Sequence, residues 1–447
     1  MKKLIYIGTI GAFLFTACSK EVNDNTPSGT DQRLAVLLSE QSPNKSKDYF
    51  ILPDDGDLAS IPQDPKNPLS HAKVELGKFL FHETAIGVKP KFDASRQTFS
   101  CASCHHVAAG FQAGRKQGIG DGGIGFGLIG EARRKDPNCP ENDVDVQPIR
   151  SPSALNSAFQ ELQLWNGQFG GVGENQNYRN QWTAGTPKEV NNKELHGLET
   201  QAIAGLTVHR LDANNQLFET TDYKNLFIQA YGNLNTSELY SLENMGKAIA
   251  AYERTLLANQ APFQQWLRGN FSAMTERQKS GAILFFGKAN CSSCHTGPAL
   301  NSMEFYALGM NDFRDSEVLK TVDEATKNGR GGFTGNPNDN YKFKVPQLYN
   351  LTESPFYGHG GSFRSVESVI RYKNKGIKEN PGVPDSQLAE TFKPLGLTEE
   401  EIVALTDFIE NGLKDPNLER LVPSTLPSGN CFPVADPESR NDLGCNL

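Results

Sequence analysis

The sequence contains the motif Cys-x-x-Cys-His twice, as Cys101-Ala-Ser-Cys104-His105 and as Cys291-Ser-Ser-Cys294-His295. Two thiols three positions apart can each form a thioether with one vinyl group of a haem, and the imidazole that follows can bind the iron. The spacing therefore predicts two covalently bound haem c groups, with the four cysteines as attachment sites and the two histidines as iron ligands. The alternatives are zinc half-sites or disulfide turns, but one zinc ion would need both motifs to converge on it and would not require the histidine twice.

The N-terminus has the pattern of an export signal. Met1-Lys2-Lys3 is basic and is followed by an apolar stretch from Leu4 to Ala17 that is too short to span a bilayer. Small residues directly before Cys18 resemble a bacterial lipoprotein box, which predicts a signal peptide over residues 1–17 and a lipid on Cys18; ordinary signal cleavage near Cys18 is the alternative. Either reading places the protein in the periplasm or cell envelope, where disulfides are tolerated.

The composition argues against nucleic-acid binding and against a membrane-spanning segment after the signal. The 447 residues carry a formal net charge of −8, which argues against nucleic-acid binding and is compatible with docking a basic electron-transfer protein. After the signal there is no run of 18 apolar residues, so attachment to a membrane would come from the lipid alone.

Outside the haem motifs and Cys18, the cysteines are Cys139, Cys431 and Cys445. A disulfide between the last two would restrict a Pro/Asn/Asp-rich tail, leaving Cys139 free or exchanged into the pair.

The pattern along the chain predicts an all-α fold made of two cytochrome c-like haem domains with long loops and insertions. Apolar residues recur at helical spacing over 241–258, a helix begins at Thr275 before the second haem motif, and Thr398-Glu399-Glu400-Glu401 has the form of a capping box before an apolar stripe. Strand-like alternation is scarce, and 118–148 and 169–195 have the composition of insertions. We expect a flexible tether over 18–50, an N-terminal haem domain over 51–265, a C-terminal haem domain over 266–420 and a tail over 421–447.

Short motifs surround the two haem sequences in a fixed order. They are Glu75-Leu76-Gly77-Lys78-Phe79-Leu80-Phe81, Arg150-Ser151-Pro152-Ser153-Ala154-Leu155-Asn156, Gln163-Leu164-Trp165-Asn166-Gly167, Leu198-Glu199-Thr200-Gln201-Ala202, Ala261-Pro262-Phe263, Trp266-Leu267-Arg268-Gly269 and Ser354-Pro355-Phe356-Tyr357-Gly358-His359-Gly360-Gly361. In this order and spacing, from about Asn67 to Leu413, the chain resembles the bacterial diheme cytochrome c peroxidase and MauG family.

The resemblance implies a function and a route of electron transfer between the haems. A small electron-donor cytochrome or cupredoxin would reduce the C-terminal haem, and electrons would pass to the N-terminal haem, where hydrogen peroxide is reduced to water. Trp165 matches the tryptophan between the haems, and electron relay and simple packing stand as equal interpretations of it. The sequence leaves the oligomeric state open, with a homodimer as one assembly to test.

The distal side of the N-terminal haem departs from the family. Gln201 matches the family's distal glutamine, but the catalytic Glu expected about ten residues later is replaced by Val208-His209-Arg210-Leu211. His209 could exchange the proton while Arg210 stabilises departing negative charge. The alternative is that His209 packs in the fold and Arg210 pairs with a surface carboxylate or a haem propionate.

Three further positions depart from the family. Asp121 stands where many members place a switching His. No Met follows Met310, so the Met ligand of the C-terminal haem is missing; Lys373 falls at the ligand place, and we take the adjacent Tyr372 as the candidate because MauG uses Tyr there. Arg150 stands where an Asn helps to hold an interdomain calcium, and its charge argues against that ion.

Two other functions compete with the peroxidase. One is a MauG-like oxidase that modifies a protein or small molecule, and the other is a diheme electron carrier without catalysis. Both keep the two haem c groups. The oxidase would store oxidising equivalents over both haems, whereas the carrier would have both irons six-coordinate and closed to added ligands.

Overall fold

The computed structural model describes residues 26–314, 318–320 and 322–445. The predicted lipid-anchor residue, Cys18, lies outside the described residues. The described chain is mostly helical, as expected, with two short antiparallel sheets in which β1 (Gly123–Ile124) pairs with β2 (Arg134–Lys135) and β3 (Phe305–Tyr306) pairs with β4 (Phe343–Lys344). Among the described residues, none of the helices combines the length and apolar character that a membrane crossing requires.

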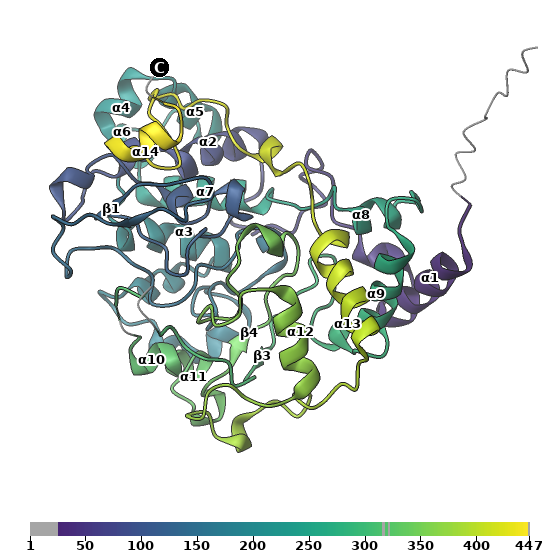
Figure 1. Cartoon of the computed structure of the whole chain (residues 1–447). Helices are drawn as coiled ribbons and strands as arrows, with labels where there is room; N and C mark the ends of the chain where they lie inside the picture. The colour runs from purple at the N-terminus through teal and green to yellow at the C-terminus, as the bar shows by residue number, and fades with distance from the viewer. Residues whose placement is uncertain (1–25, 315–317, 321, 446–447) are drawn as a thin grey trace, which may run out of the picture.

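Two large clusters of buried apolar residues divide the helices between them (Figure 1). The first cluster is built mainly by α2 (His71–His82), α3 (Gly197–Val208), α4 (Asn215–Thr220), α5 (Tyr223–Tyr231), α6 (Thr236–Leu239) and α7 (Leu242–Arg254). The second is built by α1 (Gly29–Gln41), α8 (Pro262–Leu267), α9 (Glu276–Phe286), α12 (Val366–Lys375) and α13 (Glu399–Asp407). The remaining helices are α10 (Glu324–Lys327), α11 (Arg330–Thr334) and α14 (Pro437–Asp442).

The same close helix crossing occurs in both clusters. A Cβ on Gly77 of α2 would lie 1.8 Å from the carbonyl oxygen of Ala248 in α7, and a Cβ on Gly281 of α9 would lie 2.0 Å from that of Ala404 in α13. Only glycine permits backbones to approach this closely. Each of these glycine-bearing helices precedes one of the Cys-x-x-Cys-His motifs, so the two halves of the chain repeat one local architecture.

Residues expected to form part of a flexible tether are instead ordered as helix α1. Ser28 caps this helix in a capping box with Asp31, and Leu34 and Leu38, four residues apart, are fully buried against the second cluster. The Asp31 carboxylate accepts a hydrogen bond from the indole of Trp266 at 2.6 Å and pairs with Lys279 at 2.8 Å. The polar composition of this region hid a short amphipathic helix, because one apolar residue per turn is enough to bury one side.

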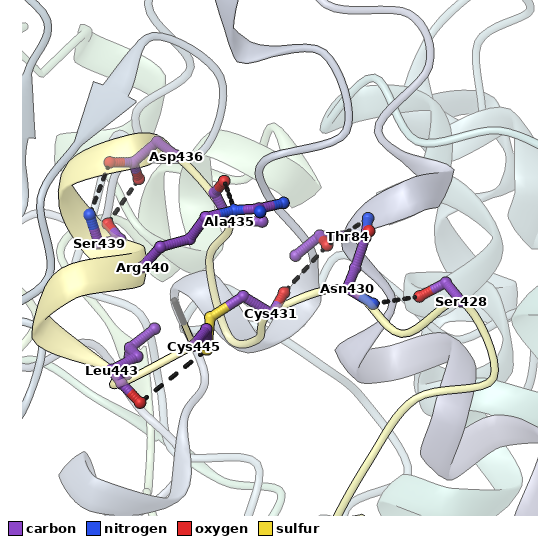
Figure 2. The surroundings of a disulfide bond; sticks show 10 residues. All are labelled: Thr84, Ser428, Asn430, Cys431, Ala435, Asp436, Ser439, Arg440, Leu443 and Cys445. Carbon is purple, nitrogen blue, oxygen red and sulfur yellow. Dashed lines mark hydrogen bonds between the residues drawn. A yellow bond between two sulfur atoms is a disulfide. The ribbon is translucent and has the colours of Figure 1, made fainter. Parts of the chain in front are cut away.

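The C-terminal tail returns to the first cluster, in which Leu418 and Leu421 are buried, and Asp436 at the start of α14 accepts the backbone N–H of Gly125 at 3.1 Å. Cys431 and Cys445 form a disulfide, whereas Cys139 is free and buried. The tail around the disulfide is held by Thr84, whose hydroxyl donates to the Cys431 carbonyl at 3.1 Å (Figure 2). Asp436 at the start of α14 forms a buried ion pair with Arg133 of the 118–148 insertion at 3.3 Å. The tail therefore fixes the insertion to the first cluster.

Two candidate haem-attachment centres

The two Cys-x-x-Cys-His motifs adopt the same turn. Each begins with a single turn of 3-10 helix, over Cys101–Ser103 and Cys291–Ser293, and each histidine amide donates to the carbonyl of the first cysteine, at 3.1 and 2.9 Å. The four thiols are free rather than paired in disulfides. In the described part of the chain no group of three or more His, Cys, Asp or Glu side chains could hold a metal ion, so the motifs do not converge as a shared zinc site would require.

Both histidines are oriented for iron by their other ring nitrogen. The Nδ1–H of His105 donates to the carbonyl of Phe111 at 3.2 Å, and that of His295 donates to the carbonyls of Leu300 and Pro346 at 3.0 and 3.1 Å. Burial lowers the pKa of each imidazole to about 4, so both are neutral and keep Nε2 as an electron-pair donor. The free thiols and the oriented, neutral imidazoles fit a haem at each motif.

A cavity of about 320 Å³ adjoins the second motif. Cys291, Cys294 and His295 line it, and its other walls are largely apolar, with contributions from α12, from Leu405 of α13 and from Ile409 in the turn that follows α13. A planar apolar ring with two polar tails needs an apolar cleft of this kind. The cavity extends to Pro152 and Trp165, which belong to the segment between the two motifs.

Trp165 connects the surroundings of the two motifs. It lines the cavity of the second motif, and its indole N–H donates to the carbonyl of Arg150 at 2.8 Å. The Arg150 guanidinium lies close enough to His105 to lower its pKa, and the carbonyl of Pro152 accepts a hydrogen bond from His105. Trp165 therefore lines the cavity of the second motif and is hydrogen-bonded to a residue that acts on His105, and this placement is compatible with both electron relay and packing.

Arg150 is a buried cation held by neutral oxygens. Its guanidinium donates to the side chains of Gln112 at 2.8 Å and Ser354 at 2.6 Å and to the carbonyls of Ala113 and Arg115 at 3.4 and 3.2 Å. Burial lowers its pKa to about 9. Four uncharged oxygens around a cation resemble the ligand set of a calcium ion, with the guanidinium in the ion's place.

Gln201 lies on α3 with a partly buried side chain that makes no hydrogen bond with the described residues. Two residues earlier, Glu199 is locked to Arg254 of α7 by contacts of 3.0 and 2.6 Å, and both side chains are buried. Glu199 is therefore a structural anchor that fixes α3 on α7, and the amide of Gln201 remains available.

His209 forms a dyad with Asp145, a residue that the sequence interpretation did not single out. Its Nδ1 lies 2.8 Å from the Asp145 carboxylate, and its charge acts on His105. Burial lowers the pKa of His209, but the charge and hydrogen bond of Asp145 outweigh burial and leave the pKa above its ordinary value. The His–Asp pair gives the first centre a proton-exchanging group whose second nitrogen is not involved in the pair.

Arg210 has a different partner from the expected ones. Its guanidinium binds the carboxylate of Asp121 and the carbonyl of Asp143, and its backbone has a φ of +60°. Asp121 is fully buried and also accepts the backbone N–H of Lys91 at 2.7 Å. The residue at the place of the family's switching His is thus held by Arg210, and the carboxylate that Arg210 binds is buried, not on the surface.

On the second centre, Tyr372 and Lys373 point to different surroundings. The Tyr372 hydroxyl donates to the carbonyl of Leu308 at 2.5 Å, its ring packs on Phe363 and Phe392, and it is not among the residues that line the cavity. Lys373 does line the cavity. The position predicted from MauG is therefore one residue away from the side chain that reaches the centre.

Glu253 is a buried carboxyl that sequence reasoning missed. Burial and the nearby charge of Glu199 raise its pKa to about 8, partly offset by Arg254, and one of its carboxyl oxygens has no hydrogen-bond partner. It acts electrostatically on Cys101. The sequence does contain a sign of this carboxyl, because Glu253 follows Ile249 by four residues and is therefore an acidic residue on the apolar face of α7.

Comparison with known proteins agrees with this geometry. Residues 71–272 match the family model described as di-haem cytochrome c peroxidase. The methylamine utilization protein MauG of Methylorubrum extorquens is 28% identical over 409 residues, covering 91% of this chain and 92% of that protein. The cytochrome c peroxidase Ccp of Escherichia coli is 32% identical over 313 residues, covering 70% of this chain and 54% of that protein. A crystal structure of a MauG-like protein associated with microbial copper homeostasis aligns with a TM-score of 0.56 at 22% identity, over 86% of this chain and 98% of that one.

Proposed function

We propose that this chain, which belongs to the di-haem cytochrome c peroxidase and MauG family, reduces hydrogen peroxide to water with electrons from a small redox protein. The observation that carries the proposal is the pair of identical Cys-x-x-Cys-His turns, each with free thiols and a neutral, oriented histidine, linked through the hydrogen bond between Trp165 and Arg150. The whole reaction takes up two electrons and two protons for each peroxide and releases two waters.

The architecture that goes with this function has a haem c bound covalently to each motif. When bound, the haems supply iron that accepts electrons one at a time and a coordination position for peroxide. We assign the N-terminal haem domain to residues 51–265 and the C-terminal, electron-entry domain to 266–420. The two buried clusters support this division, although Leu257 and Phe263 already pack in the second cluster.

The residues near the first motif supply the proton chemistry. His209, with Asp145 behind it, takes a proton from one oxygen of the peroxide at Nε2 and returns it to the other oxygen, so that water leaves instead of hydroxide. The amide of Gln201 orients the peroxide. Arg210 acts as a positioning residue, because its guanidinium fixes Asp121 and the Asp143 carbonyl beside the dyad.

The location and partners are proposals that rest on the sequence pattern. We propose that the protein is held in the cell envelope by a lipid on Cys18 and receives electrons from a cytochrome or a cupredoxin. Its net negative charge favours docking with a basic electron donor. A homodimer is the assembly that we would test first. We propose that the protein works without an interdomain calcium, because the guanidinium of Arg150 already binds the oxygens that would surround such an ion.

The direct test is steady-state turnover of peroxide by the holoprotein with a reduced donor. We expect activity well above that of free haem, a large loss in His209→Gln, and full activity in the control His71→Gln, which changes an exposed histidine at the start of α2. Turnover equal to free haem would reject the proposal. Loss of turnover in Trp165→Phe at unchanged haem content would favour electron relay, whereas unchanged turnover would favour packing.

The MauG-like oxidase is a second candidate because the MauG of Methylorubrum extorquens matches this chain over 91% of its length. It predicts a changed absorption spectrum that persists for minutes after peroxide is added without a donor. Rapid return to the starting spectrum would count against it. Both irons six-coordinate and indifferent to cyanide would favour the electron carrier over either enzyme.

A further inference from the structure

One face of helix α12 forms part of the cavity wall at the second motif. Val366, Val369, Ile370 and Lys373 all line the cavity. These positions are separated by three, four and seven residues, so they lie on one side of a helix. Tyr372 lies about 100° further round the helix axis and faces Phe363 and Phe392 instead. Lys373 is therefore the polar end of an apolar stripe that faces the haem-attachment site.

The amine of Lys373 has no protein partner within the described parts of the chain. No carboxylate, carbonyl or hydroxyl bonds to its Nζ, and the titratable groups that act on it are the thiols of Cys291 and Cys294. Its charge in turn acts on His295. Lys373 is half-buried, and its amine faces the cavity instead of a protein acceptor. It is therefore available to a group that occupies the cavity.

Other polar side chains of the cavity are already engaged by the protein. The Nε2 of His359 lies 3.2 Å from the Asp312 carboxylate, and its ring stacks on Phe343 with centroids 3.7 Å apart. The Tyr306 hydroxyl donates to Glu304 at 2.6 Å. His359 is thus held by Asp312 and Phe343, and Tyr306, which also interacts with the thiol of Cys294, donates its hydroxyl proton to Glu304.

The other lysines of the cavity are engaged as well. Lys327 pairs with Glu324 at 2.6 Å, and the buried amine of Lys344 donates to the carbonyl of Leu162 at 2.7 Å and to Gln160. Lys373 is thus distinguished from both by its lack of a partner and by its nearness to the cysteines of the motif. Met310 also lines the cavity and is the thioether that competes with Lys373.

We propose that the neutral amine of Lys373 is the second axial ligand of the haem iron at Cys291, Cys294 and His295. The inference rests on the proposed function only in requiring a haem at this motif. The ammonium proton is released to solvent when the amine binds. A hard nitrogen donor favours ferric iron more than a thioether does, so the haem would have a lower reduction potential than a Met-ligated one. The amine also closes the position to peroxide, which keeps the second centre an electron-entry site.

The test compares Lys373→Met and Lys373→Ala with Lys375→Met, a matched control at an exposed position of the same helix. Haem content is measured first as the pyridine haemochrome, and the ligands are then assigned by near-infrared magnetic circular dichroism and electron paramagnetic resonance of the ferric holoprotein. We expect the wild type and Lys375→Met to show one haem with amine ligation. Lys373→Ala should convert that haem to high spin, and Lys373→Met should give a thioether signature and a more positive reduction potential.

Several outcomes would overturn the inference. Unchanged ligand signatures in Lys373→Ala would exclude amine ligation, and a shift in potential without a ligand change would assign Lys373 to a haem propionate. Conversion to high spin in Met310→Leu, but not in Lys373→Ala, would make Met310 the ligand. Absence of haem at the second motif in the wild type would instead reject the proposed function, so the two failures are distinguishable.

Discussion

The ion pair between Glu199 and Arg254 fixes helix α3, which carries Gln201, against α7. The contacts are 3.0 and 2.6 Å and the exposed fractions of the two side chains are 0% and 1%, so solvent does not screen the charges. Arg254→Leu leaves the carboxylate of Glu199 buried without its partner and close to Glu253. We expect this variant to lose about 3–5 kcal/mol in the free energy of unfolding, and Glu199→Leu to lose a similar amount.

The double variant Glu199→Leu/Arg254→Leu carries no unpaired charge and should be more stable than the sum of the single losses predicts, with a coupling free energy of at least about 2 kcal/mol. The assay is urea denaturation of the holoprotein followed by far-ultraviolet circular dichroism. Arg96→Leu is the control, because the pair of Arg96 with Asp93 is exposed and should contribute less than about 1 kcal/mol. Losses below about 1 kcal/mol in both single variants would refute the reasoning.

The other predictions concern the proton site, the guanidinium cage and the tail. Because Asp145 raises the pKa of His209, the increase of kcat/KM as His209 loses its proton should move to lower pH in Asp145→Asn; an unmoved pH profile would remove His209 from the chemistry. The same raised pKa means that this pair stabilises the fold below the unfolded pKa of His209, and that this stability is lost as pH rises through the folded pKa. Arg150→Ala should lower the free energy of unfolding by about 2–3 kcal/mol, and treatment of the wild type with EGTA should change neither stability nor turnover; a loss with EGTA alone would show that calcium is needed. Cys431→Ser opens a loop in which the cysteines are 14 positions apart, so thermal denaturation should show a loss of about 3 kcal/mol, and a reductant should produce the same loss in the wild type only.

Much of the fold could be predicted from local patterns. The helix expected over 241–258 is α7, the helix expected from Thr275 is α9, and the capping box at Thr398 begins α13. The two haem motifs could be placed because both cysteines and the histidine lie within one turn of chain. Features of this kind depend on residues that are close in sequence, so periodicity and capping are sufficient to find them.

The features that could not be predicted depend on distant contacts. The carbonyl of Pro433 accepts hydrogen bonds from Ser100 and Ser103, at 3.1 and 2.9 Å, so the tail supports the first haem motif from more than 300 positions away. The Pro/Asn/Asp-rich composition of the tail gave no sign of this contact. Similarly, the partner of Arg210 is Asp121, 89 positions earlier in the chain. Neither pairing has a periodic signature.

The choice between Tyr372 and Lys373 shows the limit of motif matching. Adjacent positions on a helix differ by about 100°, so an error of one residue exchanges a side chain that faces the cavity for one that does not. The spacing of Val366, Val369 and Ile370 contained the information needed, but only the cavity in the structure showed which side of α12 faces the second motif.

Oxidation of the fully reduced holoprotein by peroxide tests the central claim most directly. The protein is reduced by two electrons, freed of excess reductant and mixed in a stopped-flow instrument with one equivalent of hydrogen peroxide. Our account predicts that one peroxide removes both electrons from each protein molecule, and that His209→Gln slows this reaction while Lys375→Met does not. Reduced protein that persists after mixing, or that loses its electrons no faster than free haem, would contradict it.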